Sequence, residues 1–347
     1  MKNKIESEKY DNYPPQERTL TLFPLSRHSV QKRKENTPYR TGRNTLPHHA
    51  QFLNNEKLPI PNEPEQITVR STRSFLLQYV YSLSLSLLFW EGIQQMKKVI
   101  SVTLRKGGSG KTTTAVNLAT ALQLQGKKTL LIDLDDQANA TISVGINPFT
   151  LKRSIHTLFT DINVAPQDVL ITTEYGLTIL PANDDLKHTA VGMTATQIGA
   201  LKPLIAALRD QFDYIIIDTQ PSHTFLSLSA LVASDGILTP LQIHYLAMQG
   251  LTQVLEDVKK VQNGLNPHLE ILGIVPNMVQ PNTNIARLIL EQVRKNYAQY
   301  LLPVEIKYSV KLIEASLVGQ PISQYAPNHE STKDYIALAE VIYAKTR

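Results

Sequence analysis

The stretch Lys106-Gly107-Gly108-Ser109-Gly110-Lys111-Thr112-Thr113 is the strongest indication of the fold in this 347-residue chain. An apolar run at 99–104 predicts a buried strand before it, and 112–125 predicts a helix after it. On such a strand-loop-helix turn, glycines let backbone N–H groups approach phosphate oxygens at a helix N-terminus, whose dipole favours anions. The stretch therefore predicts a phosphate-binding loop, in which Lys111 contacts the β- and γ-phosphates and the Thr112 hydroxyl binds magnesium.

The loop departs from the common pattern G-x-x-x-x-G-K-[ST] in one respect. That pattern requires glycine at position 105, where this chain has Arg105. A Gly-Gly pair preceded by a second lysine, Lys106, takes its place. The alternative is a flexible glycine turn that happens to end in Gly-Lys-Thr, and the flanking strand and helix disfavour it.

Carboxylates follow two further predicted strands. Strand 128–133 runs into Asp133-Leu134-Asp135, and strand 214–218 ends in Asp218. Ligands of an open parallel sheet bind beyond the carboxyl ends of the strands, so these acids are expected near the loop. A solvated strand end with Asp as a helix cap is the weaker interpretation of Asp133 and Asp135.

Several motifs in order carry a family resemblance. They are K-G-G-x-G-K-T-T-T at 106–114, D-x-D-x-Q-x-N-A-T at 133–141, I-D-T-x-P-S at 217–222, Pro240-Leu241-Gln242 with Tyr245-Leu246-Ala247, and Lys311-Leu312-Ile313-Glu314-Ala315. From about Met96 to the C-terminus the chain resembles the ParA/MinD group of P-loop ATPases with a deviant Walker A motif, and most closely the ParA-type partition proteins. The resemblance implies an α/β fold, with a doubly wound, mainly parallel sheet, for an ATPase domain over 96–347.

The resemblance assigns roles to matching residues. Lys106 matches the signature lysine that reaches the ATP of the other subunit, and Gly107 would lie against that subunit. Asp135 matches the acid that orients the attacking water, Asp133 supports the switch and Asp218 is the Walker B acid. The resemblance implies that Lys106, Lys111 and Asp135 are catalytic and that Thr112, Asp133 and Asp218 bind magnesium. Asn277 resembles the asparagine that reads the adenine edge. The implied nucleotide-binding residues are Lys106, Gly107, Gly108, Ser109, Gly110, Lys111, Thr112, Thr113 and Asn277.

The same resemblance implies a nucleotide-switched cycle. ATP with magnesium bridges two subunits, the dimer binds DNA without sequence preference, and slow, partner-stimulated hydrolysis releases it. The expected partners are a second copy of the chain, nucleoid DNA, and a ParB-like centromere-binding or cargo adaptor protein. The implied place is the cytoplasm, on the nucleoid, and the cargo is a chromosome, a plasmid or another body.

Four residues depart from the family pattern. Ser109 stands where relatives often have valine, Asp136 and Ala138 where they have proline and glycine, and Gln220 where they have a second proline or similar residue. None of these changes removes a charged or hydroxyl group that phosphoryl transfer needs. We expect these changes to affect the stiffness of the nucleotide-responsive switch and the rate of hydrolysis more than nucleotide binding.

Two other functions stay open. A MinD-like membrane-associated regulator of division-site placement would need a C-terminal amphipathic helix that is basic on one face, whereas 335–345 is better interpreted as a packing helix. A membrane partner is therefore not expected. The second is a nucleotide-binding interaction protein with negligible hydrolysis, which the changes at Asp136, Ala138 and Gln220 allow.

Composition limits the chemistry. The chain has no cysteine, which excludes disulfides, thiolate metal sites and iron–sulfur clusters. Its net charge is +5, but residues 96–347 hold 22 Lys and Arg against 21 Asp and Glu. DNA affinity would then need a local basic patch. The candidates are Lys259, Lys260, Arg287, Arg294, Lys295, Lys307 and Lys311, of which Lys307, Lys311 and Arg287 are the expected DNA contacts.

Residues 1–95 differ in composition from the rest. The stretch to Arg73 is rich in Pro, Asn, Arg and Lys and lacks sustained periodicity, which predicts disorder. The apolar segment 75–90 is shorter than the roughly 20 residues of a spanning helix. It fits a membrane-touching helix, a helix packed on the domain, or sequence outside the native protein. The third is favoured, because Met96-Lys97-Lys98 precedes the first strand as a natural start would.

The remaining pattern predicts one doubly wound domain. Strands are expected at 99–104, 129–133, 214–218, 236–241, 270–275 and 303–306, helices at 112–125, 196–211, 245–262, 284–299 and 334–345, and a hairpin over 169–180.

Overall fold

A mainly parallel sheet lies at the centre of the described part of the chain. The computed structural model describes residues 98–221, 224–244 and 247–347, so the expectations for 1–95 and its segment 75–90 lie outside the described residues. The strand order is β3-β4-β2-β5-β1-β6-β7, and each pair is parallel except β3 with β4. The strands are β1 Lys98–Val102, β2 Thr129–Leu134, β3 Ile171–Thr172, β4 Thr178–Leu180, β5 Tyr214–Thr219, β6 Gly236–Gln242 and β7 Glu270–Asn277.

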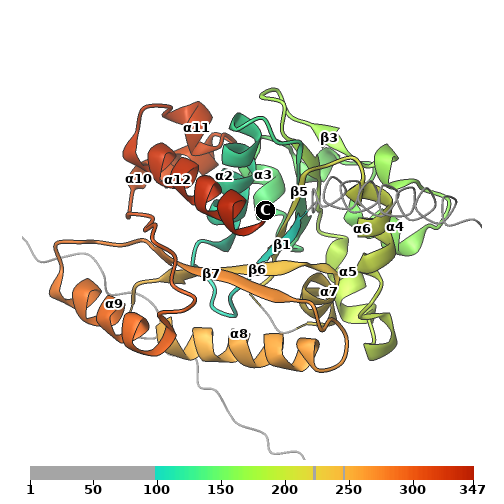
Figure 1. Cartoon of the computed structure of the whole chain (residues 1–347). Helices are drawn as coiled ribbons and strands as arrows, with labels where there is room; N and C mark the ends of the chain where they lie inside the picture. The colour runs from blue at the N-terminus through green and yellow to red at the C-terminus, as the bar shows by residue number, and fades with distance from the viewer. Residues whose placement is uncertain (1–97, 222–223, 245–246) are drawn as a thin grey trace, which may run out of the picture. The chain divides into compact units, whose positions relative to one another are not determined.

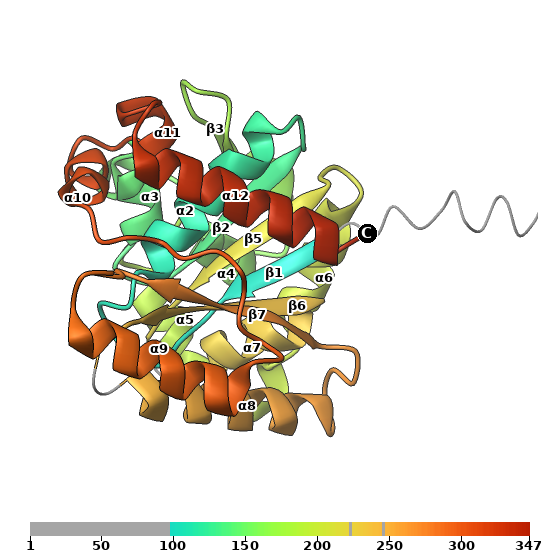
Figure 2. The same cartoon turned by 60° about the vertical axis from the view of Figure 1, so that its left-hand side comes forward.

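Helices cover both faces of this sheet (Figures 1 and 2). Figure 2 shows α10, α11 and α12 on one side and α7, α8 and α9 on the other. The predicted doubly wound α/β class is confirmed. The helices are α2 Lys111–Leu124, α3 Asn139–Ser143, α4 Ile155–Thr160, α5 Leu186–Gly192, α6 Leu201–Arg209, α7 Phe225–Ala233, α8 Ala247–Gln262, α9 Asn284–Tyr297, α10 Val310–Leu317, α11 Ile322–Tyr325 and α12 Glu330–Lys345.

Successive residues of the central strands pack against opposite layers. Ile216 of β5 belongs to a buried cluster with α2 and α12, whereas Ile215 and Ile217 pack in a cluster with α6 and α7. Side chains alternate along a strand, so a strand buried on both faces must be apolar throughout. This explains why the central strands are continuous apolar runs.

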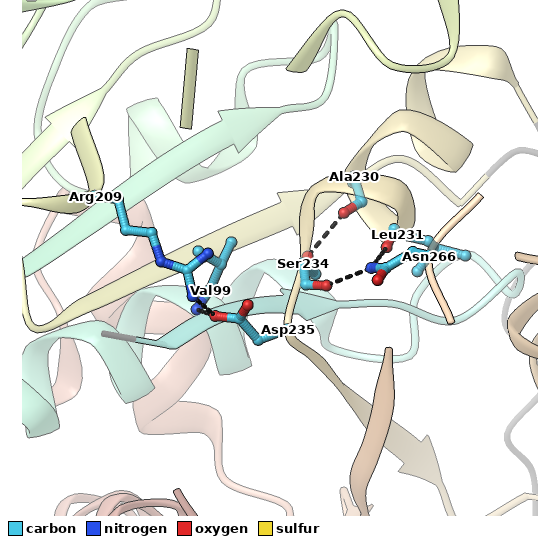
Figure 3. A network of polar contacts seen from close by, with 7 residues as sticks. All are labelled: Val99, Arg209, Ala230, Leu231, Ser234, Asp235 and Asn266. Carbon is cyan, nitrogen blue, oxygen red and sulfur yellow. Dashed lines mark hydrogen bonds and ion pairs between the residues drawn. The ribbon is translucent and has the colours of Figure 1, made fainter. Parts of the chain in front are cut away.

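Polar contacts fix the amino end of the sheet (Figure 3). The Asp235 carboxylate accepts hydrogen bonds from the Val99 backbone N–H at 2.8 Å and from the Arg209 guanidinium at 2.6 Å. The Asn266 amide donates to the Ser234 carbonyl at 2.7 Å. These contacts tie β1, α6, α7 and β6 together at the end opposite the predicted phosphate loop.

The predicted strand at 303–306 is wrong. This segment runs beside β7 and makes only isolated bridges, between Ile274 and Leu301 and between Val279 and Lys307. Two prolines explain the difference, because Pro303 and Pro276 have no N–H to donate to a ladder. The predicted hairpin is confirmed as β3 and β4, and β4 also pairs with β2.

The sequence prediction missed several helices. Helices α3, α4, α5, α7, α10 and α11 are between 4 and 9 residues long. Over so few turns an apolar stripe is hard to recognise, and α7 is apolar almost all round. Within the described ranges no single helix is long and apolar enough to cross a membrane, and only the sharply bent pair Leu186–Gly192 and Ala195–Arg209 passes that test by length and composition.

Replacing Ile216 by alanine should lower the free energy of unfolding by about 2–5 kcal/mol, because it leaves a cavity where β5 meets α2. Urea unfolding measures this loss. The matched variant Ile285→Ala, at a position 51% exposed on α9, should cost less than about 0.5 kcal/mol. Equal losses in the two variants would contradict the assigned core.

Candidate active site

The phosphate loop joins β1 to α2, as predicted. Gly110 precedes α2 with φ 83°, and Gly108 has φ 70°. A Cβ on Gly110 would lie 2.2 Å from the Asn277 amide nitrogen, so this position needs glycine for both its conformation and its space. The first turn of α2 has no side-chain cap. Its backbone N–H groups therefore suit an anion.

The two loop lysines differ in environment. Lys111 is buried, and its Nζ donates to the Lys106 carbonyl oxygen at 3.2 Å. Burial lowers the pKa of Lys111, and the charges of Asp218 and Asp135 oppose this shift. Lys106 is only half-buried, and its Nζ donates to Oε1 of Gln242 at 3.3 Å. Lys111 thus bonds within its own loop, whereas Lys106 contacts a residue outside the loop.

Asp218 is a buried carboxylate whose oxygens accept no hydrogen bond of normal geometry from the described residues. Its side chain is fully buried. Burial raises the pKa of Asp218 well above its usual value, Asp133 adds to the rise, and the nearby Thr112 hydroxyl opposes it. Unpaired buried carboxylates are costly, so the site fits a cation. Magnesium bound by a carboxylate, a hydroxyl and phosphates would supply the missing charge.

Asp133 lies beside Asp218, because β2 and β5 pair these two residues in register. Its Oδ2 accepts from the Thr141 backbone N–H at 2.8 Å and hydroxyl at 2.7 Å, and its Oδ1 accepts from the Asp135 N–H at 3.2 Å. Burial raises the pKa of Asp133 to about 6, although these hydrogen bonds oppose the shift. Because both of its oxygens already accept hydrogen bonds, Asp133 is better suited to holding the segment that follows it, through Asp135 and Thr141, than to direct contact with a metal.

The segment after Asp133 forms a tight turn. Asp135 is buried, and its Oδ1 accepts from the Gln137 N–H at 3.1 Å. Burial raises the pKa of Asp135 as well. Ala138 has φ 50°, a left-handed conformation that costs a non-glycine residue about 1–2 kcal/mol. The departure from glycine at this position thus places backbone strain next to the expected catalytic acid.

Asn277 reaches the loop instead of standing open to a ligand. Its Nδ2 donates to the Ser109 carbonyl at 2.8 Å, and its Oδ1 accepts from the Met278 N–H at 3.0 Å. Asn277 is buried, and both ends of its amide have partners. Its predicted contact with adenine stays a prediction, and it requires these bonds to change.

The three expected DNA contacts lie outside this site. Lys307 forms an ion pair with Glu330 at 3.3 Å, and Lys311 forms one with Glu314 at 2.7 Å. Lys307 lies three residues before α10, Lys311 is in the first turn of α10, and Arg287 is exposed on α9. Any DNA phosphate at Lys307 or Lys311 must compete with a carboxylate.

Sequence reasoning missed contacts between distant residues. The motif Pro240-Leu241-Gln242 does not indicate that Gln242 is the acceptor for Lys106. The Arg105 guanidinium donates to both carboxylate oxygens of Asp257, 152 residues further along the chain. The contact between Asp133 and Thr141 joins the first and last residues of the D-x-D-x-Q-x-N-A-T motif, and the motif alone does not indicate it.

A parallel sheet with a glycine loop after β1, and with acids at the ends of β2 and β5, defines a P-loop nucleotide hydrolase. Residues 97–271 match the family described as AAA domain. The chain is 36% identical to the sporulation initiation inhibitor protein Soj of Bacillus subtilis, over 72% of this chain and 99% of that protein. It is 36% identical to the chromosome-partitioning ATPase Soj of Thermus thermophilus, over 72% and 96%. The chain therefore belongs to the ParA-type partition ATPases, as the sequence predicted.

Solved structures agree on the fold. Cobyrinic acid a,c-diamide synthase of Mycobacterium smegmatis, with ADP and magnesium, matches with TM-score 0.61 and 34% identity over 71% of this chain and 93% of that chain. The cell division ATPase MinD of Pyrococcus furiosus matches with TM-score 0.60 and 26% identity over 72% and 99%. These matches confirm the predicted fold class.

Replacing Asp218 by asparagine should stabilise the nucleotide-free protein, because a neutral amide removes a buried charge. We expect the Tm to rise by about 2–4 °C, measured by thermal unfolding. The same variant should lose the further stabilisation that magnesium gives in the presence of ATP. Asp168→Asn, at an exposed position, is the control. A lower Tm together with intact magnesium stabilisation would contradict this account of Asp218.

Proposed function

We propose that the protein is an ATP-dependent dimerising ATPase that binds DNA without sequence preference and positions a chromosome, plasmid or other cargo. The observation that carries this proposal is the pair of lysines in one loop. Lys111 is buried and folded onto its own loop, whereas Lys106 is half-buried and contacts a residue outside the loop. A lysine side chain placed in this way can extend from its own subunit toward a partner.

ATP and magnesium are the proposed substrate and cofactor. Lys111 and the N–H groups at the start of α2 would neutralise phosphate charge. Thr112 and Asp218 would hold magnesium, which supplies further charge neutralisation at the β- and γ-oxygens. Asp135 would orient the attacking water, and Asp133 would hold the switch through Thr141. This division suits phosphoryl transfer, in which positioning and electrostatics do most of the work.

DNA binding would use exposed lysines and arginines on α9 and at the start of α10. The ion pairs of Lys307 and Lys311 are exposed, and exposed ion pairs are screened by solvent and contribute little to stability. Phosphates can therefore replace the carboxylates, and added salt should weaken binding. A centromere-binding or cargo adaptor protein would stimulate hydrolysis, and the nucleoid in the cytoplasm is the proposed location.

The membrane alternative meets a specific obstacle. Tyr335, Leu338 and Ile342 of α12 are buried in one cluster with residues of α2. The apolar face of the last helix is therefore occupied by packing, whereas a membrane-binding helix needs it exposed. The other alternative is a nucleotide-binding interaction protein with negligible hydrolysis. Measuring the rate of phosphate release from ATP tests it, with Lys111→Ala as the inactive control.

Replacing Gly107 by valine should abolish the ATP-dependent dimer while ATP binding persists. A Cβ at Gly107 meets no atom within 4 Å among the described residues of its own subunit, so valine fits the described part of the monomer and would obstruct a partner. Light scattering with and without ATP measures the dimer. Gly199→Val, at another open position, is the matched control. An ATP-dependent dimer in Gly107→Val would refute the assigned geometry.

Replacing Glu314 by glutamine should strengthen DNA binding, because Glu314 accepts from Lys311 Nζ at 2.7 Å. Releasing that lysine should steepen the slope of log affinity against log salt by up to about one. Fluorescence anisotropy with a random duplex at several salt concentrations measures both quantities. Glu340→Gln on α12 should leave them unchanged. Weaker DNA binding by the Glu314→Gln variant would show that Lys311 does not contact DNA.

A further inference from the structure

Lys106 occupies a defined place within its own subunit. Its ammonium donates to the side-chain carbonyl of Gln242, the last residue of β6. Its Cβ faces α8, because a Cβ built on Gly250 would be 3.8 Å from it. The side chain is thus placed between the end of β6 and the first turns of α8.

The residue before Lys106 fixes this arrangement. Nε of Arg105 donates to Oδ2 of Asp257 at 2.7 Å, and its Nη2 donates to Oδ1 at 2.5 Å. Such two-point pairs hold both position and orientation. Gly250 and Asp257 are seven residues apart on α8 and so lie on one face of the helix. The entry to the loop is therefore fixed to α8, and the Lys106 side chain is directed toward Gln242.

The bond between Lys106 and Gln242 is suited to reversible release. Its length of 3.3 Å is at the long end for a hydrogen bond, and both residues are half-buried. Gln242 is neutral, so the lysine keeps its charge uncompensated at this contact. An ammonium held in this way can exchange its acceptor for a more negative one.

We propose that Gln242 is a positioning residue that holds Lys106 inside its own subunit while the subunits are apart. Dimerisation with ATP must then break this bond, so Gln242 sets how much ATP-bound protein is needed to form the dimer. The inference rests on the proposed function, because it requires Lys106 to act in the partner's nucleotide site.

Two substitutions of similar size should act in opposite directions. Gln242→Leu cannot accept a hydrogen bond, and it should lower the protein concentration at half-dimerisation in saturating ATP by about fivefold. Gln242→Glu adds a negative charge beside Lys106 and should raise that concentration. Light scattering of the full chain over a concentration series measures both effects. Gln292→Leu, exposed on α9, is the matched control and should behave as wild type.

A second measurement does not depend on the dimer. In the nucleotide-free protein, a small acylating reagent followed by peptide mass spectrometry reports the reactivity of each lysine. Lys106 should react faster in Gln242→Leu than in wild type, and more slowly in Gln242→Glu, while Lys202 serves as an internal reference.

The outcomes separate the two ideas. Opposite shifts in dimerisation, with matching shifts in Lys106 reactivity, support the inference. Unchanged reactivity of Lys106 in both variants overturns it, whether or not the protein dimerises. A wild-type protein that stays monomeric with ATP overturns the proposed function instead.

Discussion

The parallel register of β1, β5 and β2 is the constraint on which the site depends. It places Val102, the last residue of the strand that leads into the phosphate loop, beside Asp218, and Asp218 beside Asp133. Three chain segments far apart in sequence thus bring a glycine loop and the carboxylates of Asp218 and Asp133 to one edge of the sheet. Because the strands are buried on both faces, a slip by one residue would exchange their apolar faces and disperse the site.

Burial gives these groups their chemical character. Burial of Asp218 raises its pKa, and burial of Lys111 lowers its pKa, so both are costly as charged groups until a ligand arrives. Asp133 avoids much of this cost through hydrogen bonds from Thr141 and Asp135. Among the described residues, the Asp133 oxygens thus accept three hydrogen bonds, whereas the Asp218 oxygens accept none of normal geometry. This difference is consistent with a structural role for Asp133 and a metal-binding role for Asp218.

The sequence predicted the sheet, the loop and its acids because each depends on local patterns. Buried parallel strands are long apolar runs, and Gly110 is required by its own φ and by the close approach of Asn277. Contacts such as Lys106 with Gln242 and Arg105 with Asp257 join residues more than a hundred positions apart, and no local pattern reports them. The strand expected at 303–306 does not form, because Pro303 and Pro276 have no N–H to donate to the ladder that the apolar residues suggest.

The decisive experiment measures binding of the full chain to a random-sequence duplex with ATP, with ADP and without nucleotide, at two salt concentrations. We expect binding that requires ATP, weakens with added salt and does not depend on the DNA sequence. Equal binding with ATP and ADP, or no binding in any nucleotide state, would contradict it.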